Sequence, residues 1–180
     1  MSTRRWLLLG AVVVATVVGF LLFRPDTLFT DIEADESLDE AFAITTTAQL
    51  ADTTSTTIDE PATTVTEAVT EPVQILAGQF SGIDHSAEGT ASVYEQDDRF
   101  VLRFEDDTNI QNGPDLYVWV LPASSYEGGT PSDYFDLGTL KGTIGGQNYE
   151  LPNGFDPQLH RSVLIWCLRF AVPFASAPLG

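Results

Sequence analysis

The sequence predicts an all-β fold, a sandwich or barrel of about eight to ten short strands, preceded by one transmembrane helix and a disordered stalk. Three observations lead to this prediction. From residue 75 onward, short apolar runs alternate with clusters of Gly, Pro, Asn, Asp and Ser, without a sustained helical period. Residues 6–23 contain no charged side chain. Residues 45–74 are rich in Thr and lack Lys, Arg, Gly and aromatic residues.

The uncharged stretch 6–23 is long enough to cross a membrane, because as a helix it spans roughly 27 Å. A cleaved signal peptide has a shorter apolar core and a small-residue cleavage site. Here Phe23 is followed by Arg24-Pro25-Asp26 instead, so we predict an uncleaved signal anchor. Arg4 and Arg5 precede it and acidic residues follow it. Residues 1–5 should therefore be cytoplasmic and the C-terminal domain extracellular, with one passage through the cell membrane.

Residues 24–74 should form an acidic, Thr-rich extracytoplasmic stalk. The stretch has too few apolar residues to offset its chain entropy, and its acidic side chains repel one another. Scattered apolar residues in 27–44 are compatible with a short amphipathic helix near the membrane. The folded domain is then expected to occupy residues 75–180.

The apolar alternation divides residues 75–180 into strands. The run 116–121 is apolar on both faces and should be a central strand. The last run, 162–170, is apolar on both faces as far as Cys167, and its alternation continues to residue 179, so it should be buried between two layers. Arg169 should lie on the same face as Cys167, where that face begins to meet water. Further strands are expected at 75–81, 89–95, 99–105, 134–140 and 147–151.

Charge and cysteine content narrow the function classes. The chain has 26 acidic residues against 8 basic ones, a net charge of −18, and no basic stripe. We therefore predict no nucleic-acid partner, because binding phosphates requires clustered Lys and Arg. The single cysteine cannot form an intrachain disulfide. It is a site of intermolecular bonding, a reactive thiol, or a small buried apolar residue.

Five sequence blocks occur in order across about a hundred residues: Gly78-x-Phe80; His85 with Gly89-Thr90-Ala91; Gly113-Pro114-Asp115-Leu116-Tyr117-Val118; Leu137-Gly138-x-Leu140-Lys141-Gly142 with Gly145-x-Gln147-x-Tyr149-x-Leu151-Pro152; and Val163-x-Ile165-Trp166-Cys167-x-x-Phe170-x-Val172-x-Phe174-x-x-Ala177-x-Leu179. They resemble the DM-thirteen domain, a module described as an electron-transfer domain and found beside DOMON and membrane cytochrome b modules. The resemblance implies an all-β domain with a redox role centred on Cys167 and with His85 as its partner. The stretch Leu28-Phe29-x-Asp31 resembles membrane-anchored bacterial members.

The residues predict neither a metal site nor a cofactor. Haem ligation by Met and His is not available, because the only methionine is Met1, and ligation by two His would need His85 and His160 to converge. A blue-copper centre needs two His and a Cys. Such centres usually place a His a few residues after the Cys, and none follows Cys167. His85 is open to two interpretations, a base for the thiol or a surface loop residue, and His160 is expected on a surface turn.

Other polar and aromatic residues have structural explanations. Asp115 should be a turn residue and Lys141, the sole lysine, a solvated edge residue. Tyr117, Trp119 and Trp166 should be core aromatics, which could also serve as redox-accessible side chains.

Two functions of different classes remain open. The first is a membrane-tethered extracytoplasmic domain that transfers electrons through Cys167, with a redox partner protein. The second is a non-catalytic cell-surface binding or assembly module, in which Cys167 is structural.

Overall fold

The computed structural model describes residues 30–43 and 70–180. Residues 1–29 and 44–69 lie outside the described residues, and with them the predicted signal anchor and most of the predicted stalk. Within the described ranges, no helix is long and apolar enough to cross a membrane.

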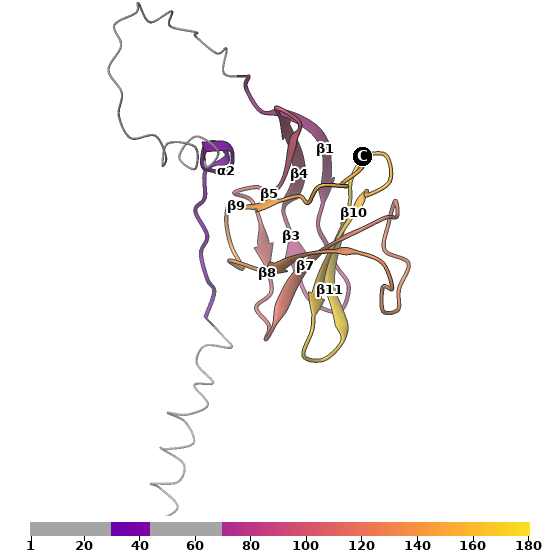
Figure 1. Ribbon diagram of the computed structural model, residues 1–180. Coiled ribbons are helices and arrows are strands. Elements are labelled where there is room, and N and C mark those ends of the chain that lie inside the picture. Colours follow the sequence, from indigo (N-terminus) through magenta and orange to yellow (C-terminus); the bar gives the residue numbers. More distant parts are fainter. Residues whose placement is uncertain (1–29, 44–69) are drawn as a thin grey trace, which may run out of the picture.

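The described part is an all-β domain, as predicted, with one short helix (Figure 1). One sheet has the order β1-β4-β5-β9, and the other has the order β2-β11-β10-β7-β8. A third pair joins β3 to β6. The sheets are open and share one core, so the fold is a β-sandwich. The strand bounds are β1 Val73–Gln79, β2 Ser81–Gly82, β3 Ala87–Glu88, β4 Thr90–Gln96, β5 Arg99–Phe104, β6 Asn109–Ile110, β7 Leu116–Leu121, β8 Phe135–Thr139, β9 Gln147–Glu150, β10 Ser162–Cys167 and β11 Val172–Pro178.

Strand β10 is buried on both faces, as its apolar pattern predicted. Val163, Ile165 and Cys167 point into the core between the two sheets. Leu164 and Trp166 point to the other side, into a second apolar cluster with side chains of β7. Tyr126 and Tyr134, from the segment after β7, pack against that second cluster, along with Tyr117 and Ala123. Strand β10 is therefore a central strand with an apolar cluster on each of its two faces.

The prediction that the last strand continues through Phe170 is wrong. Strand β10 ends at Cys167, residues 168–171 form a turn, and β11 returns antiparallel, with Cys167 opposite Val172. Arg169 is exposed in this turn and does not share a strand face with Cys167. The apolar alternation runs on through the reversal, and the turn contains no Gly, Pro, Asn or Asp to mark it. Instead Ala171 adopts the positive φ of 53°.

Residues 30–43, here called the strap, lie along β9 and residues 142–148 (Figure 1). The Ala34 N–H donates to the Ile144 carbonyl at 2.8 Å, and the Glu36 N–H donates to the Gly146 carbonyl at 2.9 Å. The strap ends in helix α2, Leu38–Ala43, which begins with a reciprocal capping pair between Ser37 and Glu40. The sequence had placed this segment in the stalk, whereas here it packs on the β domain.

Candidate functional site

The only thiol of the chain is closed off inside the core. Cys167 is 0% exposed, and its Sγ–H donates to the Pro114 carbonyl at 3.0 Å. Residues 112–115, here called the cover loop, lie over it. Asp115, an exposed turn residue as expected, has a φ of 55°, and its carbonyl accepts a hydrogen bond from the Leu168 N–H at 3.0 Å. The cover loop is therefore fastened both to the thiol and to the turn that follows β10.

His85 lies at the same end of the sandwich but is not bonded to the thiol. Its ring stacks on Phe174, with ring centroids 3.6 Å apart and planes at 19°. Phe174 in turn presses against the cover loop, because a Cβ on Gly113 would lie 2.5 Å from its ring. Since the thiol donates to Pro114, the geometry contains no hydrogen bond of the nucleophile–base type between Cys167 and His85. Phe174 links His85 to the cover loop.

A cavity of about 210 Å³ borders the cover loop. Its lining includes Asn112, Gly113 and Asp115 of the cover loop, Thr139 and Leu140, and Ile32 of the strap. Ile32 belongs to the segment predicted to be stalk, so sequence reasoning did not assign it to this site. The cavity provides the open space next to the loop that covers Cys167.

Stacked aromatic rings cover the outer face of β10 and β7. Tyr134 stacks on Trp119 at 3.9 Å between centroids, and Trp119 stacks on Trp166 at 5.1 Å. Trp119 and Trp166 are each 2% exposed, so they are core aromatics, as predicted. Tyr117 packs against the same cluster. That these rings exchange electrons stays a prediction.

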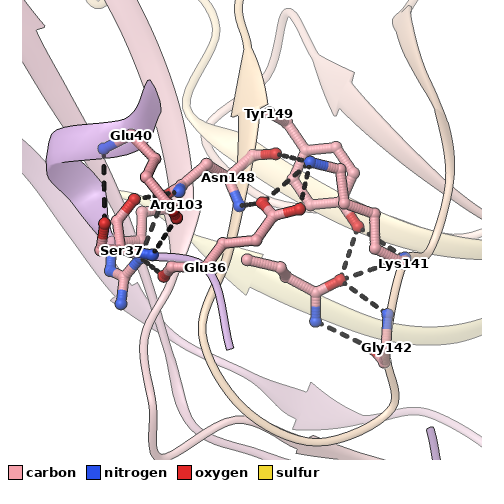
Figure 2. Close-up of polar contacts among 9 residues, drawn as sticks. Glu36, Ser37, Glu40, Arg103, Lys141, Gly142, Asn148 and Tyr149 are labelled. Carbon is pink, nitrogen blue, oxygen red and sulfur yellow. Dashed lines mark hydrogen bonds and ion pairs between the residues drawn. The ribbon is translucent and has the colours of Figure 1, made fainter. Parts of the chain in front are cut away.

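A polar network fixes the strap to the sandwich (Figure 2). The Lys141 ammonium donates to both carboxylate oxygens of Glu36 at 2.9 Å, and the Asn148 N–H donates to one of them at 2.8 Å. Arg103, which is 7% exposed, donates from Nη1 to the Glu36 carbonyl at 2.7 Å and is paired with Glu105. Lys141 is exposed, as expected, yet it is also the ion-pair partner of the strap.

The charges around Glu36 determine its protonation. Burial alone would raise the pKa of the Glu36 carboxyl, but the hydrogen bonds from Lys141 and Asn148 and the charges of Lys141 and Arg103 together lower it. The docked strap therefore favours the ionised carboxylate.

Residues 79–179 match the model of one protein family, described as Electron transfer DM13. The match covers more than half of the chain and contains Cys167, the cover loop and His85. The chain belongs to the Electron transfer DM13 family. No curated protein and no solved structure matches the chain. The strap lies before the matched residues.

His160 is remote from the thiol of the DM13 domain. It is 8% exposed, so the expectation of a surface position is wrong. Its Nδ1 accepts a hydrogen bond from the Asp156 N–H at 3.0 Å, and its ring packs on Phe135 and Phe155. It precedes β10, and from Ser162, where β10 begins, to Cys167, where it ends, the strand spans about 17 Å. Among the described residues, no group of three or more His, Cys, Asp or Glu is placed to hold a metal ion.

Proposed function

We propose that the chain is a membrane-tethered extracytoplasmic electron-transfer domain in which Cys167 is the redox group. The observation that carries this proposal is the position of the thiol. It is the only sulfur within the DM13 match and lies under the cover loop. A small cavity borders that loop. A thiol held this way is protected from bulk solvent and becomes reachable when the loop moves by a short distance.

The chemistry that suits a lone cysteine is a thiol–sulfenate–disulfide cycle with external reactants. A hydroperoxide forms an S–O bond to Cys167 as its O–O bond breaks, and the thiol proton leaves with the departing alcohol or water. An external thiol then forms an S–S bond with Cys167 and releases water. A second external thiol restores the Cys167 thiol and leaves with the first as a disulfide. Two electrons pass from the external thiols to the hydroperoxide.

The tether of this proposal is residues 6–23, with the N-terminus in the cytoplasm and the DM13 domain outside. Its support is the uncharged length of that stretch and the two arginines before it. Protease added to intact cells stripped of their wall should cut within residues 44–69. Complete protection of those residues, with cutting only after the membrane is opened, would show the opposite orientation.

The redox role is tested on the full chain in detergent or lipid discs. Mild hydroperoxide followed by a sulfenic-acid trapping reagent should add mass at Cys167 under native conditions, and Cys167→Ser should abolish that product. His85→Gln should slow the reaction if His85 assists, with an unchanged thermal midpoint as the folding control. A thiol that reacts only after denaturation would overturn the redox proposal and leave the binding or assembly module with a structural cysteine.

A further inference from the structure

The strap enters the sandwich at the Cys167 end. The Asn112 side-chain amide donates to the Thr30 carbonyl at 2.7 Å, so the first described residue lies on the cover loop. The same loop accepts the Leu168 N–H. From there the strap runs along β9, and α2 reaches the opposite end, where Arg99 donates to the Phe42 carbonyl (Figure 1). Thr30, the cover loop and the turn 168–171 are thus neighbours.

The length of chain before Thr30 limits how the domain can sit on a membrane. Residues 24–29 separate the uncharged stretch 6–23 from Thr30. From Phe23 to Thr30 a fully extended chain covers at most about 25 Å. The opposite end of the sandwich lies farther off by the length of β1, roughly 23 Å for its seven residues. Turning the domain over would therefore need a link stretched almost to its limit.

Exposed apolar side chains gather at this same end. In the turn 168–171, Leu168 is 52% exposed and Phe170 is 63% exposed. Ile32 of the strap is 54% exposed, and Ile83, whose N–H donates to the Phe174 carbonyl, is 40% exposed. Of the six large exposed apolar residues in the described ranges, these four surround the cover loop. Val73, which is 60% exposed, lies at the far end of β1.

We infer that the turn 168–171 contacts the lipid interface of the membrane that anchors the chain, so that the Cys167 end faces the bilayer. This inference rests on the tether of the proposed function. Leu168 and Phe170 then insert their side chains among the lipid headgroups, where exposed aromatic and aliphatic groups are stabilised. The redox partner of Cys167 is then one that approaches along the membrane surface.

The charged residues near the turn 168–171 determine which lipid headgroups this end of the domain should prefer. Arg169 lies between the two apolar residues of the turn and attracts lipid phosphate. Asp31, Asp84 and Asp115 are exposed around it and repel anionic headgroups. The contact should therefore depend on the apolar side chains and be stronger on zwitterionic than on strongly anionic vesicles.

The test places a fluorophore on the full chain in phosphatidylcholine vesicles that carry a nitroxide on the headgroup. In a Cys167→Ser background, Phe170→Cys is labelled at the turn, and Val73→Cys, with a similar exposed fraction, is labelled at the far end. Quenching should be several-fold greater at position 170 than at position 73. Leu168→Cys provides a second label position if the first variant does not fold.

Flotation of the vesicles separates the two proposals. A chain that does not float with the vesicles overturns the tether and this inference together. A chain that floats but shows equal quenching at both positions overturns this inference alone. Glu36→Lys, which places a cation against Lys141, should release the strap and reduce quenching at position 170. Unchanged quenching in that variant would refute the orienting role of the strap.

Discussion

Replacing Glu36 by Gln should loosen the strap while leaving the sandwich folded. The Glu36 carboxylate accepts two hydrogen bonds from the Lys141 ammonium and one from the Asn148 N–H. Gln keeps one acceptor oxygen but loses the charge and the second oxygen. All three groups belong to the contact between strap and domain, so the substitution acts on docking and leaves the core between the sheets unchanged.

The size of the effect on strap docking follows from two opposing free-energy terms, the hydrogen bonds that docking forms and the chain entropy that it costs. Residues 32–37 of the strap make eleven hydrogen bonds to the domain, each with a net contribution of about 1 kcal/mol. Ordering these six residues costs about 6–12 kcal/mol. The two free-energy terms are therefore of similar size, and the loss of a few contacts should shift the docking equilibrium measurably. Losing the ion pair, which is partly exposed, and weakening one charged hydrogen bond should cost about 1–2 kcal/mol, or roughly 5–30-fold in the docking equilibrium.

Hydrogen exchange measures this equilibrium directly. The amides of Ala34 and Glu36 are protected only by the Ile144 and Gly146 carbonyls, so their exchange should accelerate by the same factor. Asp35→Asn is the matched control, since it removes the same charge from an exposed neighbouring side chain. Unchanged exchange in Glu36→Gln, or equal acceleration in both variants, would refute the assigned role of the carboxylate.

The hydrogen-exchange protection of the Ala34 and Glu36 amides should also depend on pH. The docked strap lowers the pKa of Glu36 below its value of 4.5 in the free chain. The stabilisation from the ionised carboxylate is therefore complete above about pH 4.5 and is lost as the pH falls through the docked pKa. Protection at Ala34, after correction for intrinsic exchange, should fall in acid in the native chain. It should change much less in Glu36→Gln, and an identical acid response in the two proteins would contradict this linkage.

Two further predictions concern the hairpin and the cover loop. Trp166→Ala should lower the free energy of unfolding by about 3–5 kcal/mol, because the ring is 2% exposed. Phe170→Ala, at a 63% exposed position, should change the free energy of unfolding by about 0.5 kcal/mol or less. If denaturant titrations gave equal losses for the two variants, the exposed turn between β10 and β11 would be contradicted. Gly113→Ala should cost about 1–3 kcal/mol, because its Cβ would lie 2.5 Å from the Phe174 ring. It should also speed alkylation of Cys167, and an unchanged thermal midpoint and labelling rate would show that the loop absorbs the methyl group.

The strands were predictable because the signals for them are local. Apolar alternation and turn residues placed β1, β4, β5, β7, β8, β9 and β10 to within a few residues. The hairpin after Cys167 was missed because its turn, Leu168-Arg169-Phe170-Ala171, is composed of residues that also suit a strand. Only the positive φ of Ala171 and the pairing of β10 with β11 show the reversal, and both are properties of the folded chain.

The strap was missed because its contacts are tertiary. Gly142 and Gly145 approach the strap so closely that a Cβ on either would lie within 2.7 Å of an Ala34 atom. From the sequence alone these glycines looked like turn residues. The local signals were the scattered apolar residues in 27–44, which suited a short helix, and the capping pair Ser37-x-x-Glu40, which marks the start of α2; neither indicates what the segment packs against.

The strap and the covered thiol are parts of one arrangement. Ile32 lines the cavity beside the cover loop, and the Thr30 carbonyl accepts a hydrogen bond from Asn112 of that loop. Undocking the strap therefore removes one wall of the cavity and one fastening of the loop, while the Pro114 carbonyl still accepts the Cys167 thiol. The strap and the thiol thus share the cover loop, residues 112–115, as a contact, through Asn112 on one side and Pro114 on the other. We therefore expect a change in the contacts of Glu36 to affect the cover loop only through Ile32 and Thr30, the two strap residues that touch the cavity and the loop.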